Sequence, residues 1–260
     1  MLGPALPVTA VDAVVVHHRR PRNVVRIVEA LREQSLPVTV TVVDAGGLAG
    51  PLPADAARAA DRVVTLSRNE GPFNRYAALP LLDAPLAWFH DDDLLPGPRA
   101  AEGLVAQAAA LDADGAGPGW SVLGHHGRRL RADGSYRADP SDAVRRGEVP
   151  QVVDVVVHSY LARTAELHHL DLLRRELGLR LPLREDDLLL CCALQRATGR
   201  PAVVAARDGW GVDSAVDAVV LPADGALSAD AGHLASRDAF LARARAAGWR
   251  RLPVVEVVGR

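Results

Sequence analysis

Short valine-rich runs alternate with amphipathic stretches over the first ninety residues of the chain. Apolar residues recur at every third and fourth position from Val24 to Leu31, which predicts one buried face of a helix that begins at Pro21. Further helices are predicted near 54–60 and 73–82. The predicted strands, each a short apolar run, are residues 11–16, 38–43, 62–66 and 86–90. Strands that alternate with helices at this spacing predict a parallel sheet with right-handed crossovers, as in a Rossmann-like half.

Beyond residue 93 the alternation becomes less regular. The stretch 207–232 is rich in Asp, Gly and Ala and is long enough to be a functional loop. Neither an internal repeat nor a linker divides the chain, so we expect one domain over 1–260 with two parts, about 10–93 and about 94–260. The further predicted helices are 97–112, 161–177, 187–198 and 234–247, and the further strands are 120–124, 128–131, 152–158 and 201–205.

The composition is that of a soluble globular protein with nearly balanced charge. Hydrophobic residues make up 49% of the chain, charged residues make up 24%, and the formal net charge is −2. A nucleic-acid-binding protein normally carries a basic excess, so this class is disfavoured. The N-terminus resembles neither a signal peptide nor a membrane-spanning segment, and we expect a cytoplasmic protein without an integral membrane segment. The adjacent Cys191 and Cys192 exclude a disulfide framework and a Cys-x-x-Cys metal site.

The chain contains no lysine, so all 30 residues counted as Lys or Arg are arginines. We attribute this to codon bias in a GC-rich genome. It has a chemical consequence nevertheless, because no lysine can act as a base, form a Schiff base or bind phosphate. A P-loop is excluded for the same reason.

Three carboxylates follow directly after the fourth predicted strand, at Asp91, Asp92 and Asp93. Alternate residues of an extended chain point the same way, so Asp91 and Asp93 can face one site. Ligands of open α/β sheets bind at such strand ends, and a divalent cation shared with a diphosphate would explain three grouped like charges. A solvated acidic turn before the next helix is the alternative, and the spacing alone favours neither.

Two further groups carry candidate chemistry. Glu185, Asp186 and Asp187 would lie in the first turn of a helix, where the helix dipole favours acids; a carboxylate that faces a sugar is the other explanation. His233 and Arg237 are four residues apart and could bind phosphate oxygens from one helix face. A helix-entry histidine and a surface arginine are the more common outcome of that spacing.

Together, the Rossmann-like half, the Asp cluster and the later acidic turn resemble a GT-A glycosyltransferase. Within this class the chain is most similar to the C-terminal domain of the exostosin family (glycosyltransferase family 64), with family 2 next. The similarity spans about residues 10–258. Three segments carry it: Asn74-Arg75 with Pro80 and Asp91-Asp92-Asp93; Glu185-Asp186-Asp187-Leu188 with Thr198-Gly199-Arg200-Pro201; and Leu227-Ser228 with His233, Arg237 and Leu252-Pro253-Val254-Val255-Glu256.

The resemblance implies a GT-A fold, with a Rossmann-like nucleotide-sugar-binding half, a mixed central sheet and a smaller acceptor-side half. It implies a retaining transferase that uses Mn²⁺ (or Mg²⁺) and takes a hexosamine or uronic acid from a UDP-sugar. Carried over by position, the metal ligands would be Asp93 and Asp91. The catalytic residues would be Asp187, Asp186 and Arg237. Nucleotide-sugar contacts would come from His17, Asp44, Asn69, Asn74, Arg75, Asp91, Asp92 and His233.

The chain also departs from the exostosin pattern. It lacks the family's cysteines and signal anchor and has a shorter loop before the acidic turn, which suggests a bacterial relative with a different acceptor (a glycan, a lipid-linked sugar or a small molecule). In the inverting scheme of family 2, Asp186 or Asp187 would instead be the general base. A sugar nucleotidyltransferase would normally have a Gly-rich loop and a lysine after the first strand, and neither is present. A non-catalytic module that binds a nucleotide sugar is the third alternative.

Overall fold

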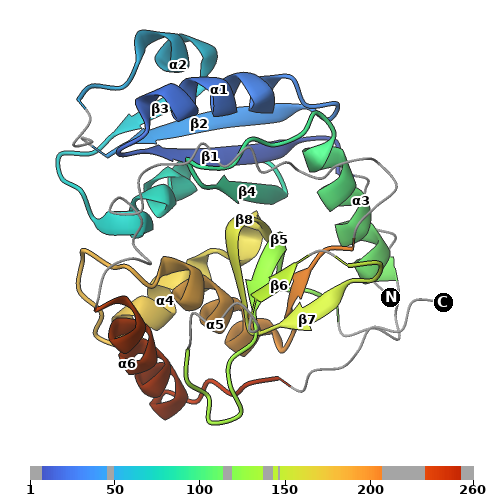
Figure 1. Cartoon of the computed structure of the whole chain (residues 1–260), viewed down its shortest axis with the longest axis vertical. Helices are drawn as coiled ribbons and strands as arrows, with labels where there is room; N and C mark the ends of the chain where they lie inside the picture. Colours follow the sequence, from blue (N-terminus) through green and yellow to red (C-terminus); the bar gives the residue numbers. More distant parts are fainter. Residues whose placement is uncertain are drawn as a thin grey trace.

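The computed structural model describes residues 8–45, 50–113, 119–136, 143–145, 147–206 and 232–252. In this part of the chain nine strands form one mixed sheet in the order β3-β2-β1-β4-β8-β5-β9-β7, with β6 paired to β5 (Figure 1). The strands are β1 (Val11–His17), β2 (Val38–Asp44), β3 (Arg62–Thr65), β4 (Leu86–His90), β5 (Val122–Arg128), β6 (Ala143–Arg145), β7 (Gln151–Val153), β8 (Val155–Arg163) and β9 (Ala202–Val204). The helices are α1 (Pro21–Arg32), α2 (Ala54–Ala59), α3 (Ala100–Ala113), α4 (His168–Glu176), α5 (Asp186–Thr198) and α6 (His233–Ala246), with 3-10 helices η1 (Gly71–Leu81) and η3 (Thr164–Glu166).

The N-terminal half of the sheet has the predicted parallel arrangement. Strand β1 pairs with β2 and β4, and β2 pairs with β3, all in parallel. Helix α1 packs on β1 and β2 beside α2 (Figure 1). The apolar positions from Val24 to Leu31 that predicted its inner face are all buried. These observations confirm the strand–helix alternation predicted for this half.

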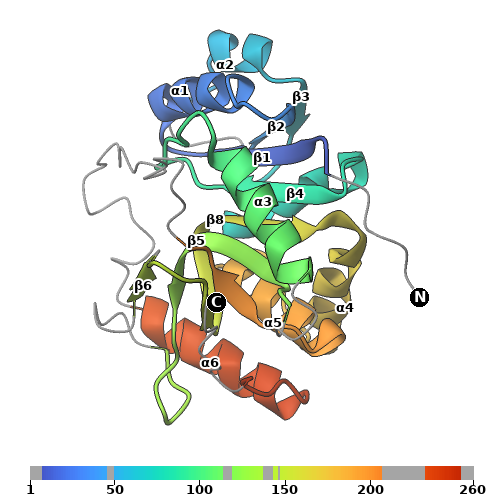
Figure 2. The ribbon, with the colours of Figure 1, turned by 90° about the vertical axis from the view of Figure 1, so that its right-hand side faces the viewer.

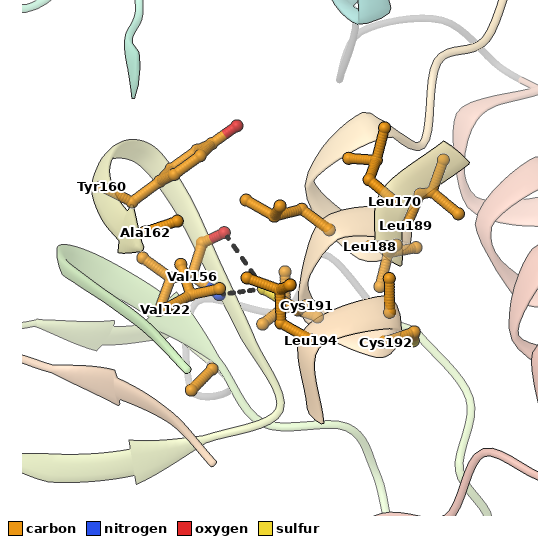
Figure 3. Close-up of a cluster of buried hydrophobic side chains, with 14 of the residues drawn as sticks. Val122, Val156, Tyr160, Ala162, Leu170, Leu188, Leu189, Cys191, Cys192 and Leu194 are labelled. Atoms are coloured by element: carbon orange, nitrogen blue, oxygen red, sulfur yellow. Dashed lines mark hydrogen bonds between the residues drawn. The ribbon is translucent and has the colours of Figure 1, made fainter. Parts of the chain in front are cut away.

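Two apolar cores lie on the two faces of the sheet. Neighbouring residues of β1 alternate between them, because Val14 packs in the core with α5 and Val15 packs in the core with α1. Cys191 and Cys192 of α5 belong to the first core, where the Cys191 sulfur accepts a hydrogen bond from the backbone N–H of Val156 (Figure 3). Burial raises the pKa of Cys191 to about 12, so this thiol stays protonated and acts as a packing group.

The structure differs from the predicted elements in several places. The single strand predicted at 152–158 is two strands, β7 and β8, which are separated at Asp154, and β6 was not predicted. The helix predicted over 73–82 is the 3-10 helix η1, because Pro80 inside it has no N–H to donate and its ring crowds the carbonyl four residues earlier. One strand, β5, replaces the two predicted at 120–124 and 128–131. Strand β8 continues to Arg163, where a helix was predicted from Leu161, because β8 is paired on both sides, with β4 and β5.

The parallel strands end at one edge of the sheet. Strand β1 ends at His17, β2 ends at Asp44, and β4 ends at His90, directly before Asp91. Helices α5 and α6 pack against each other, far from α1 and α2 (Figure 2). None of the described helices has the length and apolar character needed to cross a membrane.

Candidate functional site

The aspartates that follow β4 each have a charged neighbour. Asp91 Oδ1 accepts a hydrogen bond from Arg75 Nη2 at 2.7 Å, and Asp91 Oδ2 lies 3.3 Å from His158 Nδ1. Arg20 Nη1 lies 2.6 Å from Asp92 Oδ1 and 2.8 Å from Asp93 Oδ2. The structure therefore brings together the predicted aspartates with Arg20 and His158.

The aspartates differ in acidity because their neighbours differ. Burial alone would raise the pKa of Asp91, but the charge of Arg75 and the hydrogen bond from His158 hold it well below its usual range. Burial raises the pKa of Asp92 to about 6, against the lowering effect of Arg20. Partial burial would lower the pKa of His158, but Asp91 raises it above its ordinary value.

One part of this group has the composition of a metal site. Ligand atoms of Asp91, Asp93 and His158 all lie within 4.8 Å of one another. Asp93 Oδ1 is buried and has no hydrogen-bond partner. A buried carboxylate oxygen without a partner, beside a second carboxylate and an imidazole, fits a divalent cation. The two predicted metal ligands therefore meet the geometric requirement.

Arg75 connects the two acidic groups of the sequence. Its Nε lies 3.1 Å from Asp186 Oδ2, while its Nη2 donates to Asp91. The Asp186 contact is an ion pair without hydrogen-bond alignment, since Nε donates instead to the Pro72 carbonyl. Arg75 Nη1 also donates to the Tyr160 hydroxyl at 3.3 Å. Only 9% of Arg75 is exposed, so its guanidinium mainly positions these groups.

Asp186 is a buried carboxyl group at the start of α5. Burial raises its pKa to about 7, against the lowering effect of Arg75, and the charges of Asp187 and Asp91 raise it further. Its Oδ2 has no hydrogen-bond partner. A carboxyl group that titrates near neutral pH is suited to accept a proton in general base catalysis.

Asp187 has a different environment from its neighbour. Arg237 Nη2 donates to Asp187 Oδ2, and the backbone N–H of Leu188 donates to Oδ1. The Arg237 guanidinium stacks 4.1 Å above the centre of the Tyr136 ring. Asp187 and Arg237 therefore join the start of α5 to the start of α6.

His233 and Arg237 lie on the same side of α6, as their spacing predicted. The ring of His233 contacts that of Tyr136 edge-on, with centroids 6.4 Å apart, and Arg237 stacks on the same ring. Both residues are buried, and burial lowers the pKa of His233. Of the motif around them, Leu227, Ser228 and residues 253–256 lie outside the described residues, as does 207–231 of the predicted functional loop.

The other predicted nucleotide contacts lie at the ends of β1 and β2 and in the loop after β3. His17 is fully buried, and its Nδ1 lies 3.0 Å from Asp44 Oδ1. The side-chain oxygen of Asn69 accepts hydrogen bonds from Asn74 and from the backbone of Gly71. These bonds give the two asparagines a role in shaping the loop; their predicted contact with a nucleotide stays a prediction.

Sequence reasoning missed three residues of the site. Arg20 comes three residues after the last residue of β1, so its position just beyond the end of a predicted strand was an available signal. His158 and Tyr160 lie in β8, and nothing in the local pattern showed which strand β8 would join. A cavity of about 420 Å³ lies elsewhere, with Trp249, Arg250 and Arg251 among its lining residues and none of the predicted site residues.

The fold is similar to that of TarS from S. aureus. Its residues 1–349 in complex with UDP give a TM-score of 0.50 at 17% identity, covering 76% of this chain and 58% of that one. The complex with UDP-GlcNAc gives 0.50 at 15% identity, covering 76% and 59%. The chain thus spans less than two thirds of these neighbours. No family model matches the chain, and no curated protein matches its sequence.

The comparison establishes the predicted fold class, a GT-A-like fold with a mixed central sheet. At this identity the likeness shows the fold alone. The exostosin resemblance gains no support from it.

Proposed function

We propose that this protein is a glycosyltransferase that transfers a sugar from a UDP-sugar to an acceptor with the help of a divalent cation. One observation carries the proposal: buried Arg75 connects the Asp91/Asp93 group to Asp186, at the carboxyl edge of the parallel strands of a GT-A-like fold. The UDP and UDP-GlcNAc complexes of TarS support the choice of donor.

Each part of the site has a task in this reaction. Asp91 and Asp93 would hold a divalent cation, which would supply positive charge to stabilise the departing diphosphate. Arg20 and Arg75 orient these carboxylates, because each arginine holds one of their oxygens. Since the chain has no lysine, any further side-chain cation for the phosphates must be arginine. His233 stands at the start of α6, and its buried Nδ1 has no hydrogen-bond partner, so a neutral imidazole there can donate a hydrogen bond to a phosphate oxygen.

We further propose that transfer inverts the anomeric configuration, although the exostosin resemblance implied retention. The acceptor hydroxyl oxygen forms the new bond to the anomeric carbon, the bond from that carbon to the diphosphate breaks, and Asp186 takes the hydroxyl proton. The raised pKa of Asp186, about 7, suits this task, whereas Asp187 has both oxygens engaged. We assign Asp187 to positioning, through Arg237.

The test is a panel of UDP-sugars, beginning with UDP-GlcNAc, incubated with the protein and Mn²⁺. Slow donor hydrolysis needs no knowledge of the acceptor, and NMR of the freshly released sugar reads its configuration before mutarotation. We expect hydrolysis of at least one donor with inversion, and its loss in Asp93→Asn and Asp186→Asn. A retained configuration would contradict the role of Asp186. Tight UDP binding without any turnover would favour the non-catalytic nucleotide-sugar-binding module.

The identity of the donor sugar, the acceptor and the cytoplasmic location stay predictions. A hexosamine is the first donor to test, and the acceptor classes to test are a glycan, a lipid-linked sugar and a small molecule.

A further inference from the structure

His158 has an unusual backbone conformation. Its φ is 69°, and it is the one residue other than glycine with a positive φ in the described part of the chain. A histidine in this left-handed region is strained, whereas a glycine would adopt it freely. Such strain concentrates at functional sites, where the surrounding structure maintains it.

The strain coincides with a β-bulge. Strand β5 pairs His126 with Val157 and Gly124 with Tyr160, so two residues of β8, His158 and Ser159, oppose a single residue of β5. Bulges of this kind turn a side chain away from the regular alternation of a strand. Here the bulge directs the His158 imidazole toward Asp91 and Asp93.

Buried hydrogen bonds hold the bulge in place. The Ser159 hydroxyl accepts from Trp88 Nε1 at 2.8 Å and lies 2.9 Å from His90 Nδ1. The carbonyl of His158 accepts from the backbone N–H of Asp91 at 2.9 Å. The bulge and the aspartate that follows β4 are thus one fixed unit. His90 differs from His158, because both ring nitrogens of His90 already have partners.

Asp91 and Asp93 each have one carboxylate oxygen that the arginines do not hold. Arg75 holds Asp91 Oδ1 and Arg20 holds Asp93 Oδ2, while Asp91 Oδ2 lies 3.3 Å from His158 Nδ1 and Asp93 Oδ1 has no hydrogen-bond partner. Adjacent ligands of a small octahedral ion lie about 3 Å apart. A single ion can therefore contact both oxygens and the imidazole after small adjustments.

We infer that His158 is the third protein ligand of the cation, beside Asp91 and Asp93, and that its nitrogen makes the site prefer Mn²⁺ over Mg²⁺. Magnesium is bound almost entirely through oxygen, whereas first-row transition metal ions accept imidazole nitrogen readily. This inference rests on the metal site of the proposed function, but it does not depend on the sugar or on the stereochemistry.

The test measures metal binding by the protein with UDP present, and no turnover is required. Mn²⁺ and Mg²⁺ affinities are compared by calorimetry in the wild type, His158→Gly, His158→Ala and the control His168→Ala, which removes an exposed histidine of α4. We expect His158→Gly to bind Mn²⁺ at least about tenfold more weakly, with a smaller change for Mg²⁺. Electron spin-echo spectroscopy of bound Mn²⁺ should show a directly coordinated nitrogen in the wild type and in His168→Ala but not in His158→Gly.

His158→Gly also separates loss of the ligand from loss of the fold. Because glycine relieves the strain, this variant should unfold at the same or a higher temperature than His158→Ala while it binds Mn²⁺ no better. An unchanged Mn²⁺ affinity and an unchanged nitrogen signal in His158→Gly would overturn the inference. So would a wild type that binds no Mn²⁺. If Asp93→Asn abolishes Mn²⁺ binding while His158→Gly does not, the metal site stands and only the role of His158 is refuted.

Discussion

Arg75 is a buried guanidinium with four partners, which lie in η1, in β8, in α5 and directly after β4. It contacts the Pro72 carbonyl, the Tyr160 hydroxyl and two carboxylates that come from opposite ends of the site. Arginine can do this because its five N–H donors form a planar fork, whereas lysine is a compact point charge. The sequence resemblance predicted contact with the nucleotide or donor sugar, and the low exposure of Arg75 indicates that it acts on them through Asp91 and Asp186.

Arg75→Lys should therefore remove most of the activity and lower stability together. We expect a loss of donor hydrolysis of about 100-fold or more, because Asp91 and Asp186 lose their common partner, and a destabilisation of about 3 kcal/mol, as when a buried ion pair is broken. Hydrolysis rates and urea denaturation measure the two effects. The control is Arg58→Lys, an exposed arginine of α2, which should change neither. Wild-type hydrolysis in Arg75→Lys would contradict the bridging role.

Asp186 predicts a pH dependence of activity. If it is the general base, the turnover number should rise with pH up to about 7 and then level off, because only the ionised carboxylate accepts a proton. Asp186→Asn should abolish this rise together with the activity. A pH profile in which turnover falls between pH 5 and 7 would exclude Asp186 as the base.

The same pKa predicts a pH dependence of stability with the opposite direction. The folded state binds the Asp186 proton more tightly than the unfolded chain, whose carboxyl groups titrate near pH 4. The stabilisation from Asp186 is therefore complete below about pH 4 and is lost as the pH rises through about 7. Between pH 5 and pH 8 the free energy of unfolding should therefore decrease, and this decrease should be smaller in Asp186→Asn. Urea denaturation of both proteins at pH 5 and at pH 8 tests this. Part of the slope should persist, since Asp92 also has a raised pKa, about 6.

At the scale of elements, the starts of α5 and α6 depend on each other. The Arg237–Asp187 ion pair and the hydrogen bond from Ser236 to Glu185 both join these two helix starts. Arg237 also covers the Tyr136 ring, so it contributes packing as well as charge. The helix dipole, the simpler of the two explanations, favours the acids at the start of α5. In addition, Glu185 and Asp187 contact side chains of α6.

Removing this pair should loosen α6 first. In Arg237→Met the apolar stem can still pack on Tyr136, but the part-buried Asp187 loses its countercharge, and we expect a destabilisation of about 3 kcal/mol. In Arg237→Met, amide hydrogen exchange should accelerate relative to the wild type, and this acceleration should be larger in the first turns of α6 than in β1 or β4. Arg243→Met changes an exposed residue of the same helix and serves as the control. Equal exchange in α6 of both variants would argue against the link.

The elements that were predicted correctly are those that local interactions stabilise, and the elements that were predicted wrongly depend on distant ones. The inner face of α1 and the buried strands β1 and β2 were predicted within about one residue, because their apolar periodicity records their own burial. The errors, η1 and β8, are elements whose form depends on an internal proline or on strands that are distant in sequence. The bulge at His158 belongs to this second kind.

At the scale of the whole molecule, the site lies at the carboxyl ends of the parallel strands and not within either apolar core. The two apolar cores lie on the faces of the sheet, whereas the acidic residues follow the carboxyl end of β4 and begin α5, and Arg75 links these two groups. A cation at this site should therefore matter for ligand binding and little for folding.

Metal removal tests this separation. After treatment with EDTA we expect UDP affinity measured by calorimetry to fall about tenfold or more, since the diphosphate loses its counter-charge. The melting temperature of the ligand-free protein should change by no more than a degree or two. Added Mn²⁺ with UDP should raise it, because both bind the folded state. Metal-independent UDP binding would remove the cation from the proposed function, and unfolding by EDTA would show a structural metal instead.

The sequence by itself determined the fold class, the parallel half of the sheet, and the placement of two acidic groups, Asp91–Asp93 and Glu185–Asp187, at the ends of elements. These properties follow from periodicities and end effects that act over a few residues. Only the tertiary structure decided which side chains meet: Arg75 with Asp186, Arg20 with Asp92, and His158 with Asp91. Those partners lie 67 or more residues apart. Arg20 and Asp92 meet because β1 pairs with β4 in parallel, and His158 meets Asp91 because β8 inserts antiparallel beside β4, so both contacts are set by the pairing of whole strands.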